Sequence, residues 1–166
     1  MKWMIAADSS CDLTQEILAD GAVGFGLAPL KIVVGEKEYV DRPETDEQAM
    51  LAHMKEFKGA ATSACPSPGD FARLFDQADC SFAVCMTSHL SGTYNSALQA
   101  RQMVLERSPE KKIHVIDSHS TAGTLVLLVE RLRQLISQGL AFEEIVRLIE
   151  EYNGSMRLLF TLASYD

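Results

Sequence analysis

Hydroxyl groups crowd around one glycine in the segment SHLSGTYNSA, residues 88–97. The segment follows an apolar run, CSFAVCM at residues 80–86, so the pattern is typical of a strand, a turn and a helix start. Gly92 lets a ligand approach the backbone because it has no Cβ, and the N–H groups at a helix start attract an anion. With Ser88 and Ser91 beside that glycine, and no P-loop lysine or G-x-S-x-G motif, we expect an uncharged site that binds an anion.

Other chemistry for these residues has less support. Ser91 as a nucleophile would need a base, and His89 lies only two residues away in the same turn, a poor geometry for assisting attack. Ser91 or Thr93 would serve equally well as a simple helix N-cap. His114 and His119 are five residues apart across a strand end, and no acidic or cysteine ligand pattern accompanies them, so we predict no metal site; no motif indicates a cofactor.

Polar residues also follow two other apolar runs. Asp8 begins the triplet DSS after residues 3–7, and Asp117 begins DSHS after residues 112–116. In an open α/β sheet, ligands bind outside the carboxyl ends of the strands, so these segments should converge with the first one. The loop ATSACPSPGD, residues 61–70, should reach the same edge. We expect both aspartates to accept backbone N–H groups rather than to act as catalytic acids.

Apolar runs without alternation predict strands covered on both faces. The expected strands span residues 3–7, 25–34, 81–86, 112–116 and 157–162, with a small edge hairpin at residues 33–39. Helices should alternate with them. The expected helices span residues 13–20, 46–58, 68–78, 92–107, 121–138 and 142–152. This alternation predicts an α/β fold, a three-layer α/β/α sandwich around a mainly parallel sheet.

Capping residues locate two of the helix starts. Thr45 with Gln48 reads as a capping box, and the helix that follows should turn Met50, Met54 and Phe57 inward. Ser67 should cap the next helix, with proline at its first position and an acid at its third. The inward face of that helix is expected to consist of the apolar residues Phe71, Leu74, Phe75 and Ala78.

Composition narrows the class of protein. The chain has 166 residues, 47% of them hydrophobic, enough for one globular domain. A net charge of −8 argues against nucleic-acid binding, which needs clustered lysine and arginine. The four cysteines form no C-x-x-C pair and read as reduced thiols of a cytoplasmic protein. No apolar stretch is long enough for a signal peptide or a membrane span, so an integral membrane protein is not expected.

In combination, these segments resemble the DegV family of bacterial lipid-binding proteins. ADSSCDL, PLKIVV, TSACPSPGDF, SHLSGTYNSALQA and VIDSHSTAGTLVLLV occur in the family's order and cover nearly all of the chain. The resemblance implies two α/β domains that bind a fatty acid. It also implies that the protein presents the fatty acid to a separate fatty acid kinase, which phosphorylates its carboxylate, and that the binding protein itself is not an enzyme.

The resemblance also indicates site residues. The family's Thr-Ser-Gln-Pro-Ser segment, aligned on its proline, places Ser63 where the family has threonine, with Thr62 as the second choice if the loop is shifted by one. The serine of the Ser-Gly-Thr-Tyr motif is Ser91. Two such hydroxyls, with Gly92, Ser88 and the amides of the helix start, would hold a carboxylate without a lysine.

Family members continue into a second domain that supplies a histidine to the carboxylate site and helps to enclose the acyl chain. We therefore expect residues 1–155 to form the N-terminal lipid-binding domain and residues 156–166 to begin the connection to a domain that is missing. An apolar face carrying Leu125, Leu128 and Val129 would then be exposed and cause self-association or weaken lipid binding. An acyl- or phosphoryl-transfer enzyme using Ser91, or an inactive truncated domain, remain as alternatives.

Overall fold

The computed structural model of this protein describes residues 1–13 and 23–159. Its main sheet has the strand order β2-β1-β6-β7, and every neighbouring pair is parallel. The strands are β1 (Trp3–Asp8), β2 (Gly24–Ala28), β6 (Cys80–Cys85) and β7 (Lys112–Asp117). All six residues of β6 are buried, as expected for a central strand whose two faces are both covered.

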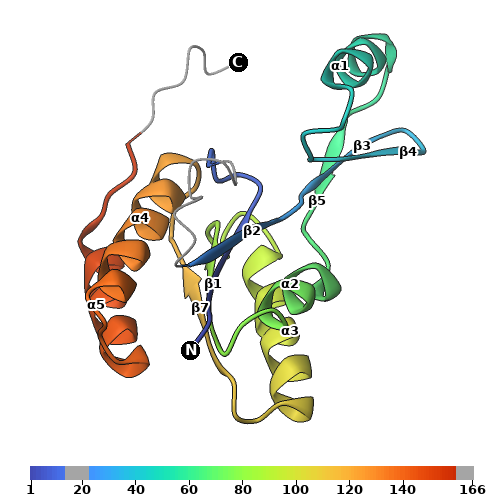
Figure 1. Ribbon diagram of the computed structural model, residues 1–166. Coiled ribbons are helices and arrows are strands. Elements are labelled where there is room, and N and C mark those ends of the chain that lie inside the picture. The colour runs from blue at the N-terminus through green and yellow to red at the C-terminus, as the bar shows by residue number, and fades with distance from the viewer. Residues whose placement is uncertain (14–22, 160–166) are drawn as a thin grey trace.

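Helices cover both faces of this sheet (Figure 1). On one face lie α2 (Pro68–Phe75) and α3 (Thr93–Arg107), and on the other α4 (Gly123–Ser137) and α5 (Phe142–Ser155). The predicted three-layer α/β/α sandwich with a parallel sheet is therefore confirmed.

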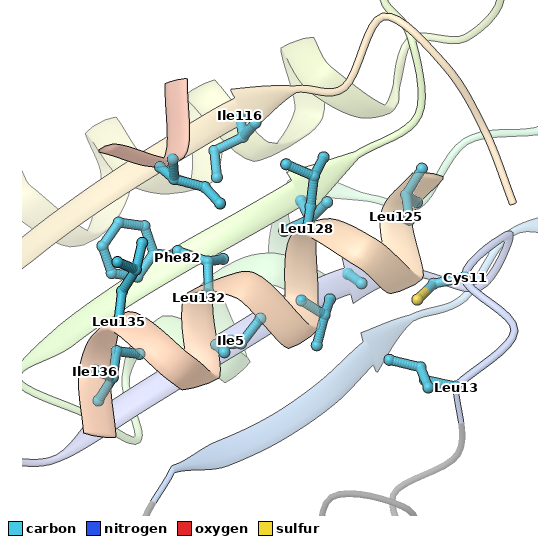
Figure 2. Close-up of a cluster of buried hydrophobic side chains, with 14 of the residues drawn as sticks. Ile5, Cys11, Leu13, Phe82, Ile116, Leu125, Leu128, Leu132, Leu135 and Ile136 are labelled. Carbon is cyan, nitrogen blue, oxygen red and sulfur yellow. The ribbon is translucent and has the colours of Figure 1, made fainter. Parts of the chain in front are cut away.

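The larger apolar core lies between the sheet and α4. Leu125, Leu128 and Val129 are fully buried there. Figure 2 shows Leu125 and Leu128 in the same cluster as Ile5 and Phe82. The prediction that these three α4 residues form an exposed face is wrong. Helix α4 packs directly on β1 and β6 in the middle of the sheet, so its apolar face forms part of the core of this domain.

A second, antiparallel sheet has the order β4-β3-β5. It contains β3 (Lys31–Val34), β4 (Lys37–Val40) and the short β5 (Thr62–Ala64). The predicted hairpin is confirmed, and Gly35 in its turn has φ 63°, a conformation that favours glycine. The single strand predicted for residues 25–34 is wrong. Pro29 has no N–H for a ladder, and the N–H of Leu30 donates to Ser9 Oγ at 2.9 Å, so the chain leaves the main sheet there.

Helix α1 (Glu47–Glu56) lies with this small sheet, apart from the helices that cover the main sheet (Figure 1). Its N-cap is Asp46, whose side chain accepts the N–H of Ala49 at 2.9 Å, whereas Thr45 donates its hydroxyl proton to the carbonyl of Val40. The predicted Thr45 cap is thus wrong by one residue. The predicted inward face is wrong too, because α1 has no buried residue and Met54 is 37% exposed.

The predicted Ser67 cap of α2 is confirmed, with Pro68 as the first helical residue, and Ser67 and Asp70 each accept the other's N–H in a capping box. The strand predicted for residues 157–162 is wrong for its first three residues, which are irregular, and its last three lie outside the described residues. The helix predicted for residues 13–20 also lies outside them, except for the non-helical Leu13. No helix in the described part of the chain has both the length and the apolar character needed to span a bilayer.

Candidate functional site

The turn between β6 and α3 carries the hydroxyl groups that the sequence singles out. The N–H groups of Leu90 and Ser91 both donate to the carbonyl of Thr87, at 3.1 and 3.2 Å. Ser91 Oγ lies 2.8 Å from Thr93 Oγ1 and accepts the N–H of Thr93 at 3.3 Å. Ser88 is exposed at the start of the turn. The turn is therefore closed by its own hydrogen bonds, with Ser91 at the entrance to α3.

Helix α3 begins without a side-chain cap. Gly92 occupies the N-cap position, and the N–H of Ser96 donates to its carbonyl at 2.9 Å. The N–H groups of Tyr94 and Asn95 precede that bond and have no acceptor among residues 1–13 and 23–159. Uncapped N–H groups at the positive end of a fifteen-residue helix suit an anionic ligand.

The loop between β5 and α2 reaches this helix start. Cys65 Sγ lies 3.7 Å from Ser96 Oγ, and it lies 3.1 Å from the position that a Cβ on residue 92 would occupy. Ser63 and Thr62 are both exposed on β5, two and three residues before Cys65. The structure thus brings the loop predicted to reach the carboxyl edge against the Ser91–Gly92 turn. The cysteine contact itself was not predicted.

Both strand-end aspartates accept backbone N–H groups, as predicted. Asp8 Oδ2 accepts the N–H of Met86 at 2.7 Å, and its Oδ1 accepts the N–H and the hydroxyl of Ser10, at 3.0 and 2.5 Å. Asp117 Oδ1 accepts the N–H groups of Ser88 and His119, each at 3.1 Å. These bonds tie the end of β6 to the strands on either side of it.

Burial acts on both carboxyl groups but with different results. The pKa of Asp8 is raised because burial disfavours its charge more than the hydrogen bonds from Ser10 and Met86 favour it. Burial also opposes ionisation of Asp117, but hydrogen bonds from Ser88 and His119 outweigh it, so the pKa of Asp117 is lowered. All four cysteines are free, and burial raises the pKa of the Cys11 thiol to about 11.

Among residues 1–13 and 23–159, neither a cluster of metal ligands nor a histidine bonded to Ser91 is present. No group of three or more His, Cys, Asp or Glu residues in the described ranges is placed to hold a metal ion. His114 pairs with Glu150 at 2.7 Å, and His119 Nδ1 lies 3.7 Å from Asp117 Oδ2. Ser91 Oγ has Thr93 rather than an imidazole as its hydrogen-bond partner among the described residues.

Two hollows lie near the carboxyl edge of the main sheet. A cavity of about 90 Å³ lies beside Ser118, Ser120 and Asn153, with room for a few water molecules rather than for an acyl chain. A pocket of about 710 Å³ is lined by Leu27, Leu74 and charged side chains near α2, not by the Ser91 turn. The carboxyl edge thus offers hydrogen-bond donors, while neither hollow joins them to an apolar tunnel.

Comparison with known proteins gives close relatives in sequence. The model of the DegV family, described as "Uncharacterised protein, DegV family", matches residues 2–166. A DegV domain-containing protein of Streptococcus gordonii is 44% identical over 168 residues, covering 100% of this chain and 59% of the relative. One from Streptococcus pneumoniae strain R6 is 45% identical over 166 residues, with the same coverage. The chain therefore spans about three-fifths of the length of these curated relatives.

Similar solved structures contain fatty acids. The Streptococcus pneumoniae fatty acid kinase (Fak) B3 protein loaded with linoleic acid has a TM-score of 0.87 and 44% identity, covering 93% of this chain and 55% of that one. A DegV family protein from Eubacterium eligens loaded with heptadecanoic acid has a TM-score of 0.83 and 37% identity, covering 91% of this chain and 54% of that one.

Proposed function

Since the chain belongs to the DegV family, we propose that it binds the carboxylate of a long-chain fatty acid at the carboxyl edge of its main sheet. The uncapped start of α3 beside Ser91 is the observation that carries this proposal. A carboxylate only accepts hydrogen bonds, so it needs N–H and O–H donors, and this edge presents them. The fatty acids in the two similar structures support the same ligand class.

Ser91 supplies a hydroxyl donor in this proposal. When Ser91 Oγ accepts from both the N–H and the hydroxyl of Thr93, its own proton is free for the ligand. The N–H groups of Tyr94 and Asn95 supply two more donors, and the dipole of α3 favours the negative charge. Gly92, which has no Cβ, lets Cys65 of the β5–α2 loop lie against the start of α3 beside these groups.

Ser63 is the proposed second hydroxyl. Side chains alternate in extended chain, and Cys65, which precedes a proline, is biased to the extended region as well. Ser63 therefore shares a side of the chain with Cys65, whose sulfur contacts Ser96 of the site, while Thr62 faces the other way. Ser88, exposed in the same turn as Ser91, would contribute a further donor.

We further propose that the protein is a carrier that presents the bound fatty acid to a separate fatty acid kinase and does no chemistry itself. Residues 1–155 would form the N-terminal α/β domain of a two-domain family protein, with residues 156–166 beginning the connection. The curated relatives are longer than this chain, which covers 59% of them, and this length difference is compatible with the proposal. Four free cysteines suit the reducing cytoplasm.

The test is Ser91→Ala. Losing a hydrogen bond to a charged group costs on the order of 1.5–3 kcal/mol, so affinity for palmitate should fall by roughly tenfold or more in a fluorescent displacement titration. Ser137→Ala, which removes a serine hydroxyl bonded within α4, is the matched control and should leave affinity unchanged. Unchanged affinity of Ser91→Ala would leave Ser91 with only its structural bonds to Thr93, and acyl-ester turnover abolished by that variant would favour an enzyme.

A further inference from the structure

Three consecutive N–H groups at the end of β6 donate to segments on either side of it. The N–H of Met86 donates to Asp8 Oδ2, that of Thr87 to the carbonyl of Ser120 at 2.8 Å, and that of Ser88 to Asp117 Oδ1. The backbone therefore enters the Ser91 turn from a fixed position, set by β1 on one side and by the β7–α4 loop on the other.

Asp117 accepts the N–H of Ser88, the last of these three groups, and its own position is fixed by further hydrogen bonds. Its Oδ1 accepts two N–H groups, from Ser88 and His119, and its side chain is only 14% exposed. Its carbonyl accepts the side-chain N–H of Asn153 on α5 at 2.8 Å. A continuous set of hydrogen bonds thus runs from α5 through Asp117 to the turn that carries Ser91.

The charge of the Asp117 carboxylate is unfavourable for binding the carboxylate of a fatty acid. Its negative charge repels a second carboxylate held a few residues away. Its oxygen, however, is a strong charged acceptor that takes two N–H groups at once, and an aliphatic side chain cannot accept either of them. The acceptor geometry of Asp117 and its charge therefore have opposite effects on an anion at the start of α3.

We propose that Asp117 is a positioning residue for the fatty-acid site, acting through the Ser88 N–H to fix the turn that presents Ser91 and the start of α3. This inference rests on the proposed function. Asp117→Asn keeps the oxygen that accepts both N–H groups and removes the charge, whereas Asp117→Ala removes the acceptor. The two variants should therefore affect ligand binding differently, which a purely electrostatic role would not produce.

The binding experiment compares both variants with wild type, using palmitate and hexadecanol. Losing charge-assisted hydrogen bonds should weaken palmitate binding to Asp117→Ala by about tenfold, with a smaller effect on the alcohol. Asp117→Asn should bind palmitate as tightly as wild type or more tightly. Glu143→Ala removes a carboxylate that pairs with Lys112 at 2.6 Å, at the opposite end of β7, and should leave both affinities unchanged. Equal loss in the two Asp117 variants, or no loss in either, overturns the proposal.

A second readout needs no ligand. Amide hydrogen exchange at Ser88, followed by NMR, should accelerate in Asp117→Ala and stay near the wild-type rate in Asp117→Asn, because only alanine frees that N–H. Wild-type protein that binds no fatty acid would refute the proposed function, and the exchange rates would still test the positioning role. Equal exchange rates at Ser88 in wild type and in both Asp117 variants would overturn the positioning role of Asp117.

Discussion

Cys65 fills the space beside Gly92 that any other residue's Cβ would enter. Its sulfur lies 3.1 Å from that Cβ position, closer than side-chain carbons normally approach. Gly92 has φ −73°, a value open to every residue, so its missing side chain matters here rather than its backbone freedom. The contact packs the β5–α2 loop against the start of α3. It therefore places the β5 hydroxyls and the Ser91 turn in neighbouring parts of the candidate site.

Gly92→Ala should therefore push the β5–α2 loop away from α3. Overpacking of this kind costs about 1 kcal/mol or more, which urea unfolding would measure. Cys65→Ala in the same chain should recover most of the loss, because it removes the sulfur that the new methyl group meets. A double variant no more stable than Gly92→Ala alone would show that the cysteine does not limit the space at residue 92.

The two hydroxyls of β5 should differ in importance. Ser63→Ala should weaken palmitate binding by roughly tenfold, because the hydroxyl proposed to donate to the carboxylate is lost. Thr62→Ala changes a side chain on the opposite side of the strand and should leave affinity within about twofold. Titration of each variant with palmitate shows which of the two hydroxyls contributes to binding. A larger effect at Thr62 would mean that the alternation through Cys65 is interrupted and that the neighbouring hydroxyl faces the ligand.

The main sheet and its helices could be predicted from the sequence because their signals are local. Apolar runs mark β1, β6 and β7, and Ser67 with Pro68 marks the start of α2. The small sheet was partly missed because β5 has only three residues, without an apolar pattern. The contact between Cys65 and Gly92 was missed because it depends on packing between segments far apart in the chain, to which no local pattern points.

Asp8 should make stability depend on pH. Burial raises its pKa above the usual 3.8, so the folded protein binds this proton more tightly than the unfolded chain. The contribution of Asp8 to the free energy of unfolding should therefore increase as pH falls through the raised pKa. Asp8→Asn cannot titrate, so the stability of wild type relative to this variant should be higher near pH 4, close to the usual carboxyl pKa, than at about pH 7.

Urea unfolding of both proteins at the two pH values gives this difference, and the other carboxyl groups cancel in it. A difference that shrinks on acidification would mean that the hydrogen bonds from Ser10 and Met86 outweigh burial and hold the pKa of Asp8 below its usual value.

Neighbouring leucines on α4 test whether its apolar face belongs to the core or to an interface. Leu128 is fully buried against the main sheet, whereas Leu127 is 51% exposed on the other side of the helix. Leu128→Ala should lower the free energy of unfolding by about 2–5 kcal/mol, and Leu127→Ala should change it by less than about 0.5 kcal/mol. Because Leu128 lies inside the domain, the first loss should not depend on protein concentration. A loss that grows on dilution, with sedimentation showing a dimer that the substitution dissociates, would instead place Leu128 in an interface between two copies of the chain.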